Sequence, residues 1–202
     1  HNNIYGQSKF DAEQIIEAFV SRTKNSTVIY RWPGIFGKFS KPNYNSVVAT
    51  FCHNISRNLP IKINNAEAML ELCYIDDVID EILEVLSSIK PGLLWGEIGK
   101  IHNISVGHLA EKINSFKNCR SSLQLERVGT SLTRALYSTY ISHLPPERFV
   151  YDLPQHTDER GTFVEMLKTP DCGQFSFFTV LPGITRGSHY HHSKTEKFLV
   201  VR

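Results

Sequence analysis

The sequence predicts an α/β protein followed by a smaller all-β segment. Up to about residue 145, short β-branched runs alternate with stretches of helical apolar period, which is typical of an α/β layer structure with parallel strands. After the double proline Pro145-Pro146 there is no helical period, and short apolar runs are separated by Gly and Pro turns. We therefore expect two domains, at residues 1–145 and 146–202.

In the first domain, an apolar face at Phe10, Ile15, Ile16 and Phe19 predicts a helix over residues 10–20. A strand at 27–31 should end in a Pro- and Gly-containing loop at 32–37, the end of a strand at which open α/β sheets bind ligands. Further strands are expected near 61–63, 70–74 and 101–104, and further helices at 47–55, 78–86, 106–116 and 131–143. The aspartates 76–77 should cap the helix at 78–86, whose apolar residues should face inward.

In the second domain, strands are expected near residues 162–168, 174–181, 187–191 and 197–202. The last of these is interrupted by the end of the sequence. We expect about 55 residues with unpaired strand edges to make a poor independent barrel, and the parallel half-sheet of the first domain, with its own unpaired edge, to aggregate or to associate with another domain.

Composition places the chain among ordinary soluble globular proteins, with 41% hydrophobic residues, 21% charged residues and a net charge of +2. There is no basic run interleaved with aromatic residues, so nucleic acid is not an expected partner. The apolar stretches are too short to span a bilayer, so no membrane partner is expected. The four cysteines include no CxxC pair, and we interpret them as reduced thiols of a cytoplasmic protein.

The first candidate site is Tyr5 with Lys9. Residues four apart lie one turn apart on the same face of a helix, where the Lys9 ammonium favours the ionised form of the Tyr5 phenol and so suits it to acid–base chemistry. The alternative is that two surface residues share a helix face by chance.

The second candidate site is a metal centre at His189, His191 and Glu196. Alternate residues of a strand point to one face, and a carboxylate beyond a short turn can return to it. Two imidazoles and a carboxylate suit zinc, nickel or iron(II), while a solvated His-rich turn is the alternative. His192 should face the other way.

Three segments in order resemble the extended short-chain dehydrogenase/reductases: Tyr5-x-x-x-Lys9, residues 30–37 and residues 74–78. The resemblance covers about residues 1–143. Residues 183–196 resemble the first cupin motif, and residues 157–165 and 186–189 resemble the cupin 3,5-epimerases of dTDP-4-keto sugars. The resemblance implies the C-terminal half of a Rossmann-type reductase followed by the first part of an all-β cupin barrel.

This fusion, together with residues 42–51 and 136–140, resembles the family of bifunctional UDP-sugar 4-ketoreductase/3-epimerases of capsular or O-antigen polysaccharide precursor synthesis. The resemblance implies a UDP-linked 4-keto amino sugar as substrate, on the route to UDP-N-acetyl-L-fucosamine. The cupin would epimerise C3 of a UDP-2-acetamido-2,6-dideoxy-hexos-4-ulose. The reductase, an NADPH-dependent oxidoreductase, would then reduce the C4 ketone. A homodimer is expected.

The resemblance also implies roles for single residues. Tyr5 would protonate the C4 oxygen, Lys9 would hold the nicotinamide ribose, and Pro33 and Gly34 would lie near the nicotinamide. The run Asn43, Tyr44 and Asn45 would contact the sugar nucleotide. A divalent metal, with zinc the first candidate, would bind His189, His191 and Glu196; in metal-free relatives the histidine after Arg-Gly is the base, so His189 has two alternative roles.

The chain lacks a GxGxxG motif, the Ser or Thr that precedes the catalytic Tyr, and a second cupin motif. We therefore expect an internal piece of a longer gene product, inactive alone and binding NADPH weakly or not at all. Two alternatives to the bifunctional enzyme stay open. In one, the cupin is a non-catalytic, metal-stabilised module for sugar binding or dimerisation; in the other, the chain is an inactive fragment.

Overall fold

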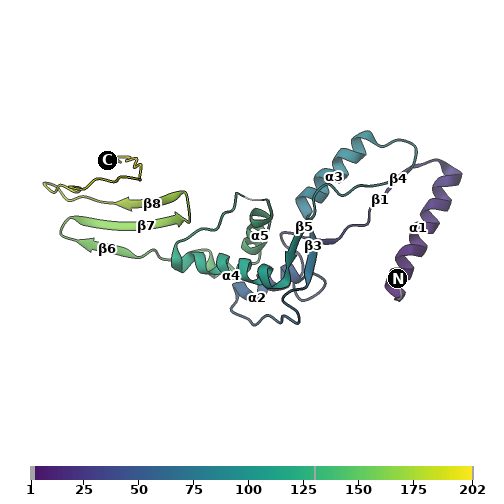
Figure 1. Ribbon diagram of the computed structural model, residues 1–202, viewed down its shortest axis with the longest axis horizontal. Coiled ribbons are helices and arrows are strands. Elements are labelled where there is room, and N and C mark those ends of the chain that lie inside the picture. The colour runs from purple at the N-terminus through teal and green to yellow at the C-terminus, as the bar shows by residue number, and fades with distance from the viewer. Residues whose placement is uncertain (1–2, 130, 202) are drawn as a thin grey trace.

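The computed structural model describes residues 3–129 and 131–201. The elements form an elongated molecule, with the N-terminal helix at one end, a helical core in the middle and a C-terminal three-stranded sheet at the other end (Figure 1). The two ends of the chain therefore lie at opposite ends of the molecule. In the part of the chain that the structure describes, each helix is too short or too polar to cross a membrane.

Helix α1 (Ile4–Thr23) carries the first candidate site. Asn3 precedes it, and the Asn3 Oδ1 accepts a hydrogen bond from the backbone N–H of Gly6 at 2.6 Å. The helix ends at Lys24, which has φ 58 in the left-handed region. The cap at Asn3 extends the helix well beyond the predicted residues 10–20, so that Tyr5 and Lys9 both lie within it.

Two small open sheets form the α/β part. Strand β1 (Ser26–Ile29) pairs in parallel with β4 (Gly92–Trp95). Strand β2 (Gly34–Phe36) pairs in parallel with β3 (Met69–Tyr74), and β3 pairs antiparallel with β5 (His102–Ser105). The prediction of parallel pairing is therefore right for two ladders and wrong for the third.

The strand predictions were right for β1, β3 and β5 and failed at three places. Residues 34–36, predicted as loop, form β2, and β4 was missed, because strands of three or four residues show too little alternation to be recognised. Residues 61–63, predicted as a strand, belong to none.

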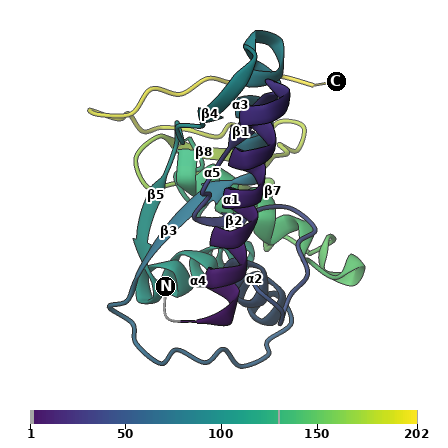
Figure 2. The same cartoon turned by 90° about the vertical axis from the view of Figure 1, so that its right-hand side faces the viewer.

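The core packs three helices against the β2–β3–β5 sheet. In the view from the end that carries α1, α2 and α4 lie below β3 (Figure 2). These helices are α2 (Val47–Ser56), α4 (Val106–Ser122) and α5 (Ser131–Ser142), all of them predicted from apolar periodicity. Their most buried branched and aromatic apolar side chains, each at most 1% exposed, are Val48, Leu109, Ile113, Phe116 and Leu136. This cluster rather than the N-terminal helix holds the described chain together.

Helix α3 (Ile75–Ser88) departs from the prediction in two ways. Asp76 and Asp77 lie in its first turn rather than at the cap, and they pair with lysines of neighbouring segments. Its apolar residues were expected to face inward, yet Val78 is buried while Leu83 is 56% and Leu86 is 65% exposed. Sheets of two and three strands offer too little surface to cover both α1 and α3.

His143 follows α5 and is only 7% exposed, and its Nε2 has no hydrogen-bond partner among the described residues. The His53 ring faces it edge-on with 6.3 Å between centroids, and the Arg57 guanidinium donates to the His143 carbonyl at 2.7 Å. Burial first, and then the neighbouring His53 and Arg57, lower the pKa of His143 below its ordinary value of 6.5. The imidazole is therefore a neutral core group near pH 7.

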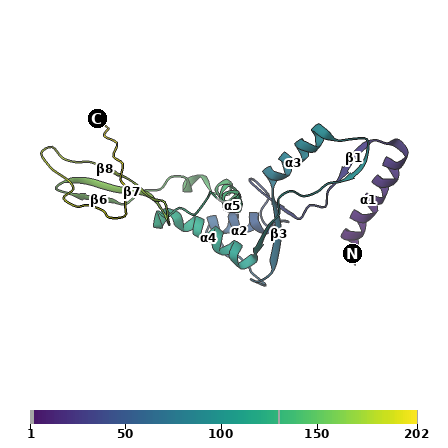
Figure 3. The ribbon, with the colours of Figure 1, turned by 45° about the horizontal axis from the view of Figure 1, so that its top comes forward.

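After a short 3-10 turn at Pro146–Arg148, the C-terminal segment forms an antiparallel meander (Figure 3). Its strands are β6 (Gln155–Asp158), β7 (Gly161–Thr169) and β8 (Gly173–Phe178). The predictions for β7 and β8 are right, whereas β6 was missed. No strand forms at 187–191 or 197–201, which corrects those predictions, and residue 202 lies outside the described residues.

A short backbone segment of the first predicted domain pairs with a strand of the second. The segment 123–125 runs beside β7, where the Leu125 N–H donates to the Lys168 carbonyl and the Lys168 N–H donates to the Leu123 carbonyl, both at 2.8 Å. Arg127 and Asp171 add an ion pair at 3.1 Å. Residues before the predicted boundary at 145 thus extend the C-terminal sheet, and the boundary itself stays a prediction.

Candidate active site and metal centre

The predicted pair on α1 is brought together. The Lys9 Nζ lies 5.5 Å from the centroid of the Tyr5 ring, and Tyr5 is 72% exposed. The exposed hydroxyl is thus free to exchange a proton with a bound molecule.

One turn further along α1, Glu13 forms an ion pair that the sequence analysis missed. The Arg31 guanidinium donates to both Glu13 carboxylate oxygens, at 2.9 and 2.7 Å, and lies over the Trp95 ring at 4.8 Å. The hydrogen bond from Arg31 lowers the pKa of Glu13, and the same bond raises the pKa of Arg31. The partners are 18 residues apart, so no local pattern could have indicated the contact.

Pro33 lies two residues after Arg31, and Gly34 is the first residue of β2. A Cβ at Gly34 would lie 3.2 Å from the Leu72 side chain and 3.3 Å from the Glu71 carbonyl, so the strand approaches β3 closely at this point. The segment is connected to α1 through Arg31. No contact that we find joins Pro33 or Gly34 to Tyr5 itself within the described residues.

The predicted substrate residues lie in the loop after β2. Asn43 has φ 54, and its N–H donates to the Thr50 Oγ1 at 2.9 Å, which ties the loop to α2. Tyr44 is 72% exposed, with the Lys41 Nζ 5.3 Å from its ring centroid, and Asn45 follows it. The loop thus presents an aromatic ring and a cation to solvent, a combination that can stack on a base and attract a phosphate.

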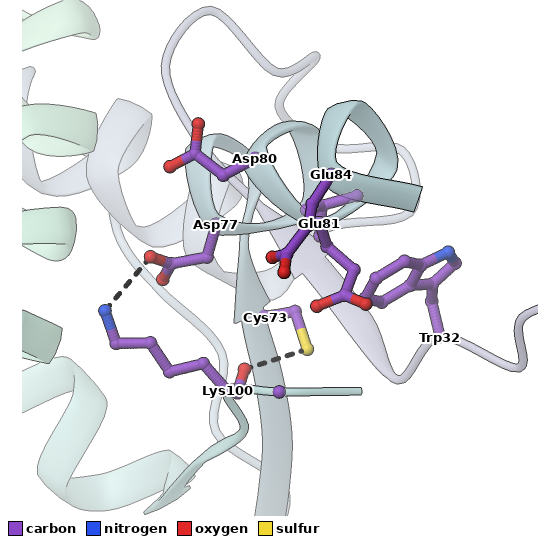
Figure 4. Close-up of a pocket in the computed structure, with 9 residues that line it drawn as sticks. Trp32, Cys73, Asp77, Asp80, Glu81, Glu84 and Lys100 are labelled. Carbon is purple, nitrogen blue, oxygen red and sulfur yellow. Dashed lines mark hydrogen bonds and ion pairs between the residues drawn. The ribbon is translucent and has the colours of Figure 1, made fainter. Parts of the chain in front are cut away.

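A cavity of about 170 Å³ beside α3 is acidic (Figure 4). It is lined by Asp77, Asp80, Glu81 and Glu84, and the Lys100 Nζ pairs with Asp77 at 3.0 Å. Four carboxylates against one ammonium repel an anionic sugar nucleotide. We therefore exclude this cavity as the site for one.

The predicted metal ligands also come together. One ligand atom from each of His189, His191 and Glu196 lies within 4.8 Å of the others, and all three residues are exposed. The His191 Nε2 and Glu196 Oε1 are 3.4 Å apart, while two ligands about 2.0–2.1 Å from a tetrahedral zinc are roughly 3.4 Å apart. The donor set and spacing therefore fit a zinc-type ion, although the segment is not the paired strand that the sequence predicted.

The neighbouring side chains alternate as expected. The His189 and His191 rings meet edge-on with 5.0 Å between centroids, and the Tyr190 and His192 rings do the same. The two pairs follow the alternation of an extended chain, with His192 among the aromatic pair rather than the ligands.

A second cavity of about 650 Å³ opens on the C-terminal sheet. Arg160 and Arg186 line it with Asp158, which pairs with both. The Nε of Arg186 is buried without a hydrogen-bond partner among the described residues, and its guanidinium lies 5.7 Å from the Phe178 ring centroid. The cavity thus holds two guanidinium groups against one carboxylate.

Comparison with family models matches two parts of the chain. Residues 1–100 match the NAD dependent epimerase/dehydratase family, and residues 156–202 match the polysaccharide biosynthesis C-terminal domain. Over 201 residues the chain is 54% identical to the UDP-2-acetamido-2,6-beta-L-arabino-hexul-4-ose reductase of Pseudomonas aeruginosa. The alignment covers all of this chain and 54% of that relative. The chain thus spans about half the length of the curated relative that it matches.

Solved structures of similar proteins support the same relationship. The capsular polysaccharide assembling protein CapF from Staphylococcus aureus superposes with a TM-score of 0.87 at 39% identity, over 96% of this chain and 53% of CapF. WbmF of Bordetella bronchiseptica, solved with NAD+, has a TM-score of 0.55 at 19% identity over 70% of this chain and 53% of its own, which shows a shared fold alone. These matches confirm the predicted fold class, an α/β segment of Rossmann type followed by an all-β segment. By sequence and by structure, the chain is a homologue of the Pseudomonas aeruginosa UDP-sugar reductase and of CapF.

Proposed function

We propose that this chain belongs to a bifunctional nucleotide-sugar enzyme of polysaccharide precursor synthesis. The enzyme epimerises C3 of a UDP-2-acetamido-2,6-dideoxy-hexos-4-ulose in its cupin part and then reduces the C4 ketone with NADPH in its reductase part. The observation that carries the proposal is 54% identity, over the whole chain, to a reductase of a UDP-linked hexul-4-ose. The Tyr5–Lys9 pair supplies the group that this reduction requires.

In the reductase part, NADPH when bound supplies the hydride. The Tyr5 hydroxyl donates its proton to the C4 oxygen as that oxygen gains charge, and the adjacent Lys9 ammonium stabilises the phenolate that remains. Lys9 also holds the nicotinamide ribose, and Pro33 and Gly34 line the nicotinamide. Tyr44, with Asn43 and Asn45, binds the nucleotide end through its exposed ring.

In the cupin part, His189, His191 and Glu196 hold a divalent ion, with zinc favoured by the donor set. Such an ion would act as a Lewis acid that polarises the 4-keto oxygen and makes the C3–H more acidic. Arg160 and Arg186 bind the diphosphate in the neighbouring cavity, since a guanidinium matches phosphate geometry.

One observation favours a second function for the cupin part. All three metal ligands are exposed and lie outside the paired strands, so an ion can serve to order this segment for sugar binding or dimerisation without chemistry at C3.

Deuterium exchange separates these two functions. The full gene product carrying Tyr5→Phe is incubated with the UDP-4-keto sugar in D₂O. Tyr151→Phe, whose ring lies against Arg120 of α4, is the matched control. Epimerisation predicts that Y5F exchanges C3–H at the wild-type rate while NADPH oxidation falls at least about 100-fold. Absence of exchange in the wild type assigns the cupin part to binding, and a Y5F variant that keeps full NADPH oxidation refutes the reductase assignment.

Elemental analysis of the same protein tests the metal. We expect stoichiometric metal in the wild type and in His108→Ala, an exposed histidine on α4, and its loss in His191→Ala. Equal metal content in all three would refute the site. The homodimer remains part of the proposal, and analytical ultracentrifugation measures it.

A further inference from the structure

We propose that Arg31 is a positioning residue for the Tyr5–Lys9 pair, because it holds the Glu13 carboxylate away from Lys9. The inference rests on the proposed reductase function for its kinetic consequence. Its structural content, a competition between Tyr5 and Glu13 for the Lys9 ammonium, can be measured independently of that function.

The competition follows from the spacing along α1. Tyr5, Lys9 and Glu13 lie at positions i, i+4 and i+8 of one helix, so Lys9 has the phenol ring one turn before it and the carboxylate one turn after it. A lysine and a carboxylate at i and i+4 attract each other on a helix surface. A free Glu13 would therefore draw the ammonium towards the C-terminal side and away from Tyr5.

In the structure Lys9 contacts Tyr5, while the Glu13 carboxylate is bound by Arg31. Both carboxylate oxygens of Glu13 accept hydrogen bonds from Arg31, and Glu13 is only 16% exposed while Arg31 is 67% exposed. Lys9 forms no ion pair within the part of the chain that the structure describes, and its Nζ lies over the Tyr5 ring. The bidentate bond thus occupies the carboxylate that could otherwise bind Lys9.

Arg31 is itself held in place from the sheet side. Its guanidinium lies over the Trp95 ring at 4.8 Å, and Trp95 is the β4 partner of Ile29, two residues before Arg31. The β1–β4 ladder therefore determines where the guanidinium meets α1. This fixes the arginine independently of the helix that it acts on.

A plain structural clamp between α1 and the sheet is the alternative, and a double-mutant cycle distinguishes it. If the Glu13–Arg31 pair acts only as a structural clamp, replacing either residue should lower kcat as much as replacing both. With the competition, Arg31→Met frees a charged Glu13 and impairs Lys9, and adding Glu13→Gln removes the competitor and restores it.

The kinetic test uses the full gene product, with Asp11→Asn as the charge-matched control on α1. We expect kcat for ketone reduction to fall about 1.4- to 2.3-fold in R31M, the size of a helical i,i+4 ion pair, and to recover in E13Q/R31M. E13Q and D11N should stay within the error of the wild type.

Equal losses in R31M and E13Q/R31M, or no loss in R31M, would overturn the proposal. If R31M does not fold, Arg31→Lys replaces it, since it keeps the charge but not the bidentate bond, and it should show a smaller loss that E13Q also rescues. If E13Q does not restore kcat in the R31K background, the proposal is likewise overturned.

A second readout needs no turnover. In the 202-residue chain, a nuclear Overhauser contact between the Lys9 Hε protons and the Tyr5 ring should be present in the wild type, weaken in R31M and return in E13Q/R31M. A contact that is unaffected by R31M refutes the competition. If the contact follows this pattern but the wild-type gene product reduces no UDP-4-keto sugar, the proposed function fails and the competition stands.

Discussion

Replacing Leu136 with alanine should destabilise the protein far more than the same change at Leu83. Leu136 is 0% exposed in the α2–α4–α5 cluster, and fully buried Leu→Ala changes cost about 3 kcal/mol through lost burial and the cavity left behind. Leu83 on α3 is 56% exposed, so less than half of its burial can be lost, about 1 kcal/mol. Leucine and alanine are both strong helix formers, so helix propensity contributes little to the difference.

Urea and thermal unfolding, both followed by circular dichroism, measure the two variants at two protein concentrations. For a chain of 202 residues, 1 kcal/mol corresponds to about 2–4 °C in Tm, so L136A should lose about 6–12 °C and L83A at most about 4 °C. The denaturant slope should stay unchanged in both. An L83A variant as costly as L136A would refute the reasoning, and a concentration-dependent loss would show that the outer face of α3 is covered by association.

Three further predictions concern the pH dependence of stability, a tight glycine and the cysteines. Because the pKa of His143 is lowered in the folded state, the unfolded chain takes up the proton first, so stability should fall as pH drops below 6.5 and level off below the folded-state value. The Tm of H143Q should depend less steeply on pH below 6.5 than the Tm of the wild type. An unchanged slope would contradict a lowered pKa of His143 in the folded state. A Cβ at Gly96 would overlap the Tyr30 ring, whereas one at Gly99 would meet only the end of the flexible Glu81 carboxylate at 3.3 Å. G96A should therefore cost about 1–3 kcal/mol and G99A almost nothing in urea unfolding. In thiol titration with a disulfide reagent, the exposed Cys172 should react first and Cys52 last, because Cys52 is buried and burial raises its pKa; simultaneous reaction would indicate that the core opens.

The sequence was informative where function depends on local spacing. The i,i+4 pair Tyr5 and Lys9 needs only a helix to meet, and the periodic residues after it predict that helix. His189 and His191 need only an extended backbone to share a side, and they share it without a paired strand. Both arrangements follow from backbone geometry over a few residues.

The same local reasoning failed where one sequence pattern is compatible with two different local structures. Acidic residues at the start of α3 are typical both of a cap and of a first turn, and Asp76 and Asp77 proved to be the second. The apolar residues of α3 correctly indicate a helix, but periodicity cannot tell whether another element covers that face. Short strands such as β2 depend on a partner far along the chain, which periodicity does not contain.

By itself, then, the sequence determined the helices, the order of the α/β and all-β segments, and both clusters of candidate residues. Only the tertiary structure decided that Arg31, 18 residues away, holds Glu13, and that the two candidate sites lie at opposite ends of the molecule. The physical reason is range. Helix periodicity and side-chain alternation act over a few residues, while ion pairs and sheet ladders between distant residues form only once the β1–β4 and β2–β3–β5 sheets bring their segments together.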